Sequence, residues 1–366
     1  MSNFYVYNAL MQRVGQIQND DSVQWLESYQ YPGEVKIVAH VTPENLAMLI
    51  AGNRIHNSES DTVARISNLD IERTESEEII TVRADLTTEL LSDRVVMGTV
   101  NAKNVEQGMY TIYNQNVRGM PIAAGSAHGY TETVDTEITW NSVLDALVTL
   151  AESSGLGFKV LFDPETGEET LKVYKGVDRA DDTSDDYVGY FGTDVGSVEK
   201  VTVTSGTTDY KNVAVVAGAG EGAARTVRIV SLGNPTGENR RELYVDARDL
   251  QREYQKATPT GQVDANGNPT YNYSTQKYTE PEYLAVLDQR GRDKLAECLI
   301  TFTITCTIAQ NNIFYGVDYD LGDRVPVKLP EYGIFATARI SSVTKIYEKD
   351  GNTIVAVLSD FEWKEA

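Results

Sequence analysis

Alternating apolar and polar residues predict β-strands near both ends of the chain. Val35, Ile37 and Ala39 recur at a period of two, which is the period of a strand with one buried face. Residues 298–308 place apolar side chains on one face and threonines on the other, as in a sheet with one wet face. Further strands are expected at residues 61–71, 79–84, 325–329, 335–347 and 353–361, with a hairpin turn at 349–352.

Helical patterns are fewer and lie between these strand-rich regions. Thr42 is a typical N-cap and Pro43 a typical first helical residue, so a short helix is expected there, ended by residues 52–53. Residues 140–155 give the clearest helix, with one apolar stripe and a glycine as C-terminal stop. Residues 86–94 predict a second short helix, and residues 158–162 and 170–174 predict a hairpin.

The region from residue 198 to residue 298 mixes strands, helices and a loop. Strands are expected at 198–204 and 213–217, and a helix at 246–256. Residues 258–279 hold hardly any aliphatic residue, so they predict a long loop. Residues 281–298 predict a long helix in which Gly291 is a weak point.

A glycine-rich turn at residues 218–225 suggests two different structures. Glycines after a strand can bind a pyrophosphate, but this needs a helix N-terminus directly downstream. Here residues 226–231 form a second β-type run that residues 233–235 close. The pattern therefore favours a β-hairpin over a phosphate-binding turn.

Length and charge limit the classes of protein that fit. At 366 residues the chain exceeds the roughly 250–300 residues that one core supports, so at least two sub-domains are expected. No apolar run approaches the ~20 residues of a membrane span, and the N-terminus lacks a secretory pattern, so folding in a cytosol is expected. The net charge of −22 argues against nucleic-acid binding. It fits either simple solubility or a conduit through which DNA slides without sticking.

Candidate reactive residues do not combine into a recognisable site. The three histidines, His40, His56 and His128, form no zinc motif, and no nucleophile elbow accompanies Ser126. The two cysteines are expected on one face of the 298–308 strand, about 26 Å apart at ~3.3 Å per residue, which excludes a disulfide.

Acidic residues form two clusters, and the first, at residues 178–186, is expected to be a solvated loop. The oxygen-rich residues 264–269 suit a calcium ion, but the full twelve-residue ligand pattern is missing. No catalytic residue, cofactor site or metal site is therefore assigned. The clusters in question are Asp178, Asp181, Asp182, Asp185 and Asp186, and Asp318, Asp320 and Asp323.

Several separated motifs together resemble the tail-tip hub proteins of siphophages and related prophage tails. The similarity covers most of the chain, and the motifs are structural rather than catalytic. They stand at residues 32–37, 43–46, 140–157, 161–164, 173–179, 220–225, 240–250 and 318–324.

The resemblance implies a mostly β, α+β chain with two tube-forming β-barrel domains and α+β peripheral material. The first barrel would be residues 1–100, and the second would combine residues 197–235 and 300–366. Residues 101–196 and 236–299 would form the periphery. Such hubs are homotrimers whose six barrels make a pseudo-hexameric ring between a sixfold tail tube and a threefold tip.

The same resemblance implies a structural, non-enzymatic role in the virion, after assembly in the bacterial host cytoplasm. Expected partners are a distal tail or tail tube protein, the tape measure protein, and tail fibre or receptor-binding proteins. DNA would pass through the lumen without specific binding, and no membrane anchor is expected. Two alternatives stay open: a tail-associated cell-wall hydrolase, and a carbohydrate-binding module suggested by the 21 tyrosines.

Overall fold

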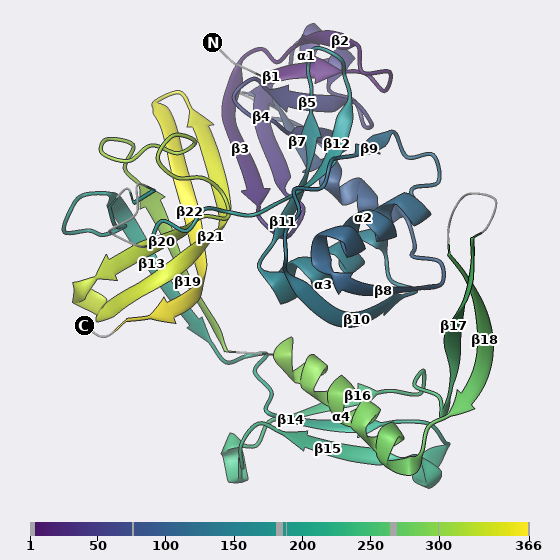
Figure 1. Cartoon of the computed structure of the whole chain (residues 1–366). Coiled ribbons are helices and arrows are strands. Elements are labelled where there is room, and N and C mark those ends of the chain that lie inside the picture. The colour runs from purple at the N-terminus through teal and green to yellow at the C-terminus, as the bar shows by residue number, and fades with distance from the viewer. Residues whose placement is uncertain are drawn as a thin grey trace. The chain divides into compact units, whose positions relative to one another are not determined.

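The chain divides into two compact units in the computed structural model (Figure 1). The structure describes residues 4–74, 77–180, 186–187, 189–263, 269–298 and 300–364. Unit 1 consists of Met1–Val203 and Thr303–Ala366, and unit 2 of Thr204–Phe302. Strands outweigh helices in both units, so the expectation of a mostly β protein is confirmed.

Unit 1 is built on one large sheet that contains strands from both ends of the chain. Its strands follow the order β13-β19-β22-β21-β3-β4-β7-β6-β5-β1-β2, with β20 paired to β21. The strands are β1 (Phe4–Tyr7), β2 (Arg13–Gln16), β3 (Asp20–Ser28), β4 (Glu34–His40), β5 (Arg54–Asn57), β6 (Val63–Arg73), β7 (Glu78–Leu86), β13 (Val198–Gly206), β19 (Thr301–Ile308), β20 (Arg324–Leu329), β21 (Ile334–Glu348) and β22 (Gly351–Trp363).

The strands expected from the sequence near both ends of the chain are confirmed. Val35, Ile37 and Ala39 on β4 are buried, and their polar neighbours face outward. The predicted turn at 349–352 joins β21 to β22, whose pairing ends at Glu348 and Gly351. This agreement follows from the period of two, because a one-residue slip would expose every core side chain.

The first predicted short helix is confirmed as α1 (Pro43–Met48). The Thr42 side chain accepts a hydrogen bond from the Asn45 backbone N–H at 3.1 Å, which satisfies one free donor of the first turn. The second is a 3₁₀ helix, η1 (Thr87–Asp93), rather than an α-helix.

The remainder of unit 1 is α+β, as the sequence predicts. The predicted helix is α3 (Val143–Ser154), capped by Ser142 and ended by Gly155 at φ 72°. The sequence analysis missed α2 (Val105–Asn116), whose polar residues and internal glycine give a weak apolar stripe. Both helices share a core with strands β8 (Thr99–Asn104), β9 (Ile122–Ala124), β10 (Thr133–Thr139), β11 (Gly157–Phe162) and β12 (Glu169–Tyr174).

Unit 2 contains a three-stranded sheet of order β15-β14-β16 and one long helix. The predicted hairpin is confirmed, because β14 and β15 pair antiparallel from Val213 with Ser231 to Ala217 with Val227. The elements are β14 (Val213–Ala217), η2 (Gly222–Ala224), β15 (Val227–Ser231), η3 (Gly237–Asn239), β16 (Glu242–Asp246), β17 (Glu253–Val263), β18 (Pro269–Lys277) and α4 (Glu280–Ala296).

Two predictions for unit 2 are wrong. Residues 246–256 are not a helix: β16 ends at Asp246, a turn follows, and β17 begins at Glu253. Residues 258–279 are not a long loop, because β17 and β18 form an antiparallel ribbon (Figure 1). The ribbon is rich in Thr, Tyr and Gln. Threonine and tyrosine favour strands, but they do not form the alternation of aliphatic residues that predicts the other strands. Residues 264–268 lie outside the described part.

The last predicted helix is confirmed as α4, and Gly291 lies where this helix packs on the sheet. An added Cβ at Gly291 would lie 2.7 Å from Val230 Cγ2 and 2.9 Å from Val216 Cγ2. The glycine therefore permits the close approach of α4 to the sheet.

The two cysteines do not share a strand face, which corrects the sequence-based placement. Cys298 lies just after α4, whereas β19 begins at Thr301 and carries Cys306. Both thiols are free, as expected. Burial raises the pKa of Cys306 to about 12, so its thiol stays protonated.

Among the described helices, none combines the length and the apolar character that a membrane span requires.

A Gly291→Leu variant should destabilise unit 2. The new side chain has to displace the stiff side chains of Val230 and Val216, and such overpacking costs about 1–3 kcal/mol. Urea unfolding measures the loss. Ala285→Leu, at an exposed position of the same helix, is the matched control and should leave the unfolding midpoint nearly unchanged. Equal effects of the two variants would contradict the close-packing interpretation.

Candidate functional site

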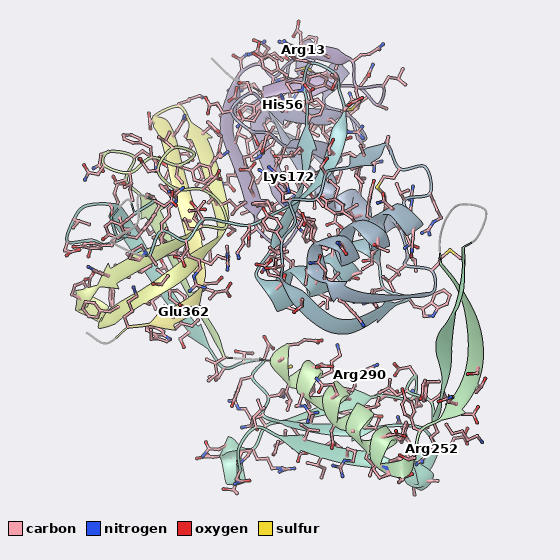
Figure 2. All side chains as sticks on the ribbon, viewed as in Figure 1. Arg13, His56, Lys172, Arg252, Arg290 and Glu362 are labelled. Carbon is pink, nitrogen blue, oxygen red and sulfur yellow. The ribbon has the colours of Figure 1, made fainter. Side chains whose placement is uncertain are left out.

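A polar cavity of about 680 Å³ lies within unit 1. Its lining includes strands β3, β21 and β22 of the large sheet, the loop between β5 and β6, strands β11 and β12, and the segment 310–323. Figure 2 labels Lys172, which β12 contributes to the cavity wall. The lining therefore brings together chain segments that are remote in sequence.

A buried ion pair joins β3 to β21 in the wall of the cavity. Glu27 Oε2 lies 3.1 Å from Lys345 Nζ, and both residues are less than a tenth exposed. Glu27 Oε1 accepts hydrogen bonds from Ser60 Oγ at 2.7 Å and Thr62 Oγ1 at 3.0 Å. Burial by itself raises the pKa of Glu27, but Lys345 and these hydroxyls outweigh it, so the pKa lies below its usual value. The carboxylate is therefore ionised.

Tyrosines line the cavity as neutral groups. Tyr347 OH accepts from Asn57 Nδ2 at 2.8 Å and lies 3.3 Å from Glu59 Oε2, its own acceptor. Lys345 Nζ lies 5.1 Å from the centre of the Tyr315 ring. Burial raises the pKa of Tyr315 and of Tyr174 well above the usual value. These phenols therefore stay protonated near neutral pH.

Ion pairs connect β11 and the following segment to the acidic side of the cavity. Lys159 Nζ lies 2.7 Å from Asp61 Oδ2. Arg179 Nε lies 2.6 Å from Asp323 Oδ2, while Asp323 Oδ1 accepts from the Val177 backbone N–H at 2.8 Å. These cations and carboxylates thus neutralise one another between the chain segments that line the cavity.

Ion pairs and protonated phenols are prominent in the lining of the cavity. Acid–base hydrolysis of a glycoside needs a carboxyl group that stays protonated, and its pKa must therefore be raised. Among the described residues, every Asp or Glu whose pKa departs clearly from its usual value has a lowered pKa. The groups are Asp21, Glu27, Glu132, Asp163, Asp246, Glu280, Glu282 and Asp288.

The acidic clusters singled out in the sequence hold turns together. Asp318 Oδ2 accepts from the Phe314 N–H at 2.8 Å, and Asp320 Oδ1 accepts from the Leu321 N–H at 2.7 Å. Asp178 Oδ1 accepts from the Ala180 N–H at 3.0 Å, and the Asp186 carbonyl accepts from Arg179. Asp181, Asp182, Asp185 and residues 264–268 lie outside the described residues.

The three histidines occupy separate places. His56 is buried, and its Nε2 donates to the Ser60 carbonyl at 3.0 Å. His128 stacks on Tyr130 with ring centres 5.4 Å apart. His40 Nε2 lies 3.4 Å from an Asp21 carboxylate oxygen.

Asp21, His40 and Glu77 form a cluster that the sequence analysis missed. Their potential ligand atoms lie within 4.8 Å of one another. They come from β3, β4 and the residue before β7, so only the strand pairing brings them together. The Lys349 ammonium also contacts the Asp21 carboxylate and lowers its pKa, which competes with any cation. The assignment of no metal site stays a prediction.

The glycine-rich turn at residues 218–225 closes the β14–β15 hairpin. The Gly218 N–H donates to the Thr226 carbonyl at 2.8 Å, and the Ala219 N–H donates to Tyr283 OH at 2.7 Å. Arg225 folds back onto the Gly218 carbonyl at 3.0 Å. These two amides are already bonded within the fold, which agrees with the hairpin interpretation.

Comparison with known proteins finds one matching family model. A family model described as "Siphovirus ReqiPepy6 Gp37-like protein" matches residues 3–358. No curated protein matches the chain in sequence.

Two solved structures are similar in fold. The tail protein from Neisseria meningitidis MC58 is 13% identical, with 98% of this chain and 96% of that chain covered and a TM-score of 0.55. The prophage MuSo2 43 kDa tail protein from Shewanella oneidensis is 11% identical, with 97% and 98% covered and a TM-score of 0.52.

A Lys345→Met variant should destabilise unit 1 by about 3–5 kcal/mol, because Glu27 is left buried without its cation. Burial then raises the pKa of Glu27, so the deficit should shrink as pH falls and the carboxyl takes up a proton. Urea unfolding at several pH values measures both effects. The double variant Glu27→Gln/Lys345→Met is the matched control and should lose less. An equal loss in both would contradict the role of the unpaired charge.

Unit 1 should lose stability as pH falls below about 6.5, partly through His56. Burial lowers the pKa of His56, so the folded chain binds fewer protons than the unfolded chain below the ordinary pKa. The contribution is fully present above that pH and falls by at most ~1.4 kcal/mol per pH unit below it. A His56→Gln variant should show a shallower decline between pH ~6.5 and ~5 in thermal unfolding. Superimposable pH profiles of variant and wild type would refute this.

Proposed function

This chain belongs to the siphovirus ReqiPepy6 Gp37-like protein family, and from that membership we propose that it is a structural subunit of a siphophage tail tip. Three copies form a homotrimeric, pseudo-hexameric ring of the baseplate-hub type, which joins the tail tube to the tip. The family match over residues 3–358 carries the proposal. Fold likeness to two tail proteins over nearly the whole chain supports it.

The strand order supports two tube-forming regions per chain. Strands β1 to β7 all lie within residues 4–86, and β13 and β19 to β22 lie on either side of unit 2 in the sequence. The ladder between β3 and β21 would connect the two regions side by side. The domain boundaries 1–100, 101–196 with 236–299, and 197–235 with 300–366 stay predictions.

The distribution of charge supports passage of DNA without binding. Unit 2 has 12 Lys and Arg against 13 Asp and Glu, a net charge of −1. Unit 1 holds the remaining 20 and 41, a net charge of −21. A ring wall made by unit 1 would repel phosphates within a Debye length of ~8–10 Å. The tape measure protein and DNA would then leave through the lumen without being held.

The proposed partners are other tail proteins. The ring would contact a distal tail or tail tube protein on one side and tail fibre or receptor-binding proteins on the other. Assembly would take place in the host cytoplasm, and the mature protein would reside in the virion.

A non-enzymatic role is part of the proposal. The ionised carboxylates and neutral tyrosines of the unit 1 cavity suit a packed joint better than a hydrolase centre. The runner-up functions are a cell-wall hydrolase and a carbohydrate-binding module. A zymogram against host cell wall and a glycan array test these two directly.

Immunogold labelling and symmetry analysis of purified phage particles should place this chain at the tail tip with threefold symmetry. The expected result follows from a ring of three chains, each supplying two tube-forming regions. Labelling of a head protein serves as the control for specificity. A position along the tail shaft, a different symmetry at the tip, or clearing in the zymogram would contradict the proposed function.

A further inference from the structure

One face of the unit 2 sheet is covered by α4 and the other is open. Ala214, Val216 and Val230 pack with Leu287 of α4 in one buried cluster. Figure 1 shows α4 lying along the strands β14 to β16. Because side chains alternate across a strand, Val215 and its cross-strand partners Ile229 and Tyr244 lie on the opposite face.

This second face exposes large apolar side chains on the two outer strands, β15 and β16. Ile229 is 60% exposed, Tyr244 62% and Val227 52%. We call Val215, Val227, Ile229 and Tyr244 the open face. An exposed cluster of this kind, with an aromatic residue near its centre, is typical of a protein contact surface.

Arginines and carboxylates lie beside the open face and balance one another in charge. Arg225 Nη1 donates to Tyr244 OH at 2.8 Å, and Arg225 and Arg248 share the Asp246 carboxylate. Glu221 is the other carboxylate at this turn, so the border is balanced in charge. The Arg248 side chain is 69% exposed, which leaves its guanidinium accessible to an external carboxylate.

The charge difference between the units limits which surfaces of two copies can meet. Unit 1 carries −21 and unit 2 carries −1, so contacts between unit 1 surfaces start from strong like-charge repulsion. Unit 2 approaches an acidic partner without that penalty. Its exposed arginine adds an attraction, and arginine and tyrosine are the residues enriched in interface centres.

We propose that the open face of unit 2 docks onto unit 1 of a second copy of this chain. The proposal rests on the ring of the proposed function and adds a further contact between neighbouring copies in it. A contact between unlike surfaces repeats head to tail and can close into a ring, whereas a contact of the open face with itself ends at two copies.

Photo-cross-linking tests the contact directly. A benzophenone amino acid replaces Ile229, and the purified full-length variant is mixed with isotopically heavy wild type. The expected product joins the residue 229 peptide of the light copy to a unit 1 peptide of the heavy copy. The same probe at Ala285, on the exposed side of α4, is the matched control and should give no such product.

A charge placed on the open face provides the second measurement. Ile229→Asp should weaken self-association in sedimentation velocity by about tenfold or more, since it brings a carboxylate against an acidic partner. Ala285→Asp adds the same charge outside the open face and should leave association unchanged. Circular dichroism checks that both variants are folded, and Ile229 is exposed enough for this to be expected.

Three results would overturn the contact. These are no mixed product up to the solubility limit of the chain, a mixed product that joins two copies of unit 2, and equal association of the two Asp variants. A cross-link formed only with another tail protein in phage particles would equally refute it. The position of the chain in the particle tests the proposed function separately, so a failed contact in a correctly placed chain leaves that function standing.

Discussion

The antiparallel ladder between β3 and β21 is the constraint on which the architecture of unit 1 depends. It pairs Ser28 with Ser342 and continues to Ser22 with Glu348. Trp25, which is paired with Lys345 at the middle of this ladder, is fully buried. Bringing such distant segments together costs loop-closure entropy, which the continuous core must offset. Without this pairing the large sheet would separate into an N-terminal and a C-terminal part.

Buried charge at the same ladder makes its register specific. An apolar pair in place of Glu27 and Lys345 could be equally stable or more stable, because desolvating two charges costs about as much as their attraction returns. A slipped register, however, would leave a carboxylate or an ammonium buried alone. Ser60 and Thr62 extend this requirement to the loop after β5. The polar lining of the cavity therefore favours one arrangement of the chain segments that form it.

The sequence predicts the local elements of this chain better than its long-range contacts. Thr42, Ser142 and Gly155 each signal a helix end through their own backbone chemistry, and the structure has the expected ends there. The β17–β18 ribbon was missed because its strand character lies in Thr and Tyr rather than in aliphatic residues. The meeting of Asp21, His40 and Glu77 depends on sheet order, for which a single sequence gives no local signal. Gly291 illustrates the same limit, since its role depends on the valines of a separate sheet.

The concentration of charge in unit 1 has a physical cost that bears on how copies can assemble. Like charges spread over one unit oppose compactness, and internal ion pairs such as Arg179 with Asp323 offset this only locally. In unit 2, by contrast, most arginines already face a carboxylate of the same unit, as Arg228 does with Asp288 at 2.6 Å. Such pairing keeps the long side chains ordered and leaves no excess of either sign. A chain divided in this way can present an acidic wall with one unit and a neutral, partly apolar surface with the other. Under the proposed function, this division of charge would correspond to a division of tasks between repelling a polyanion and holding neighbouring proteins.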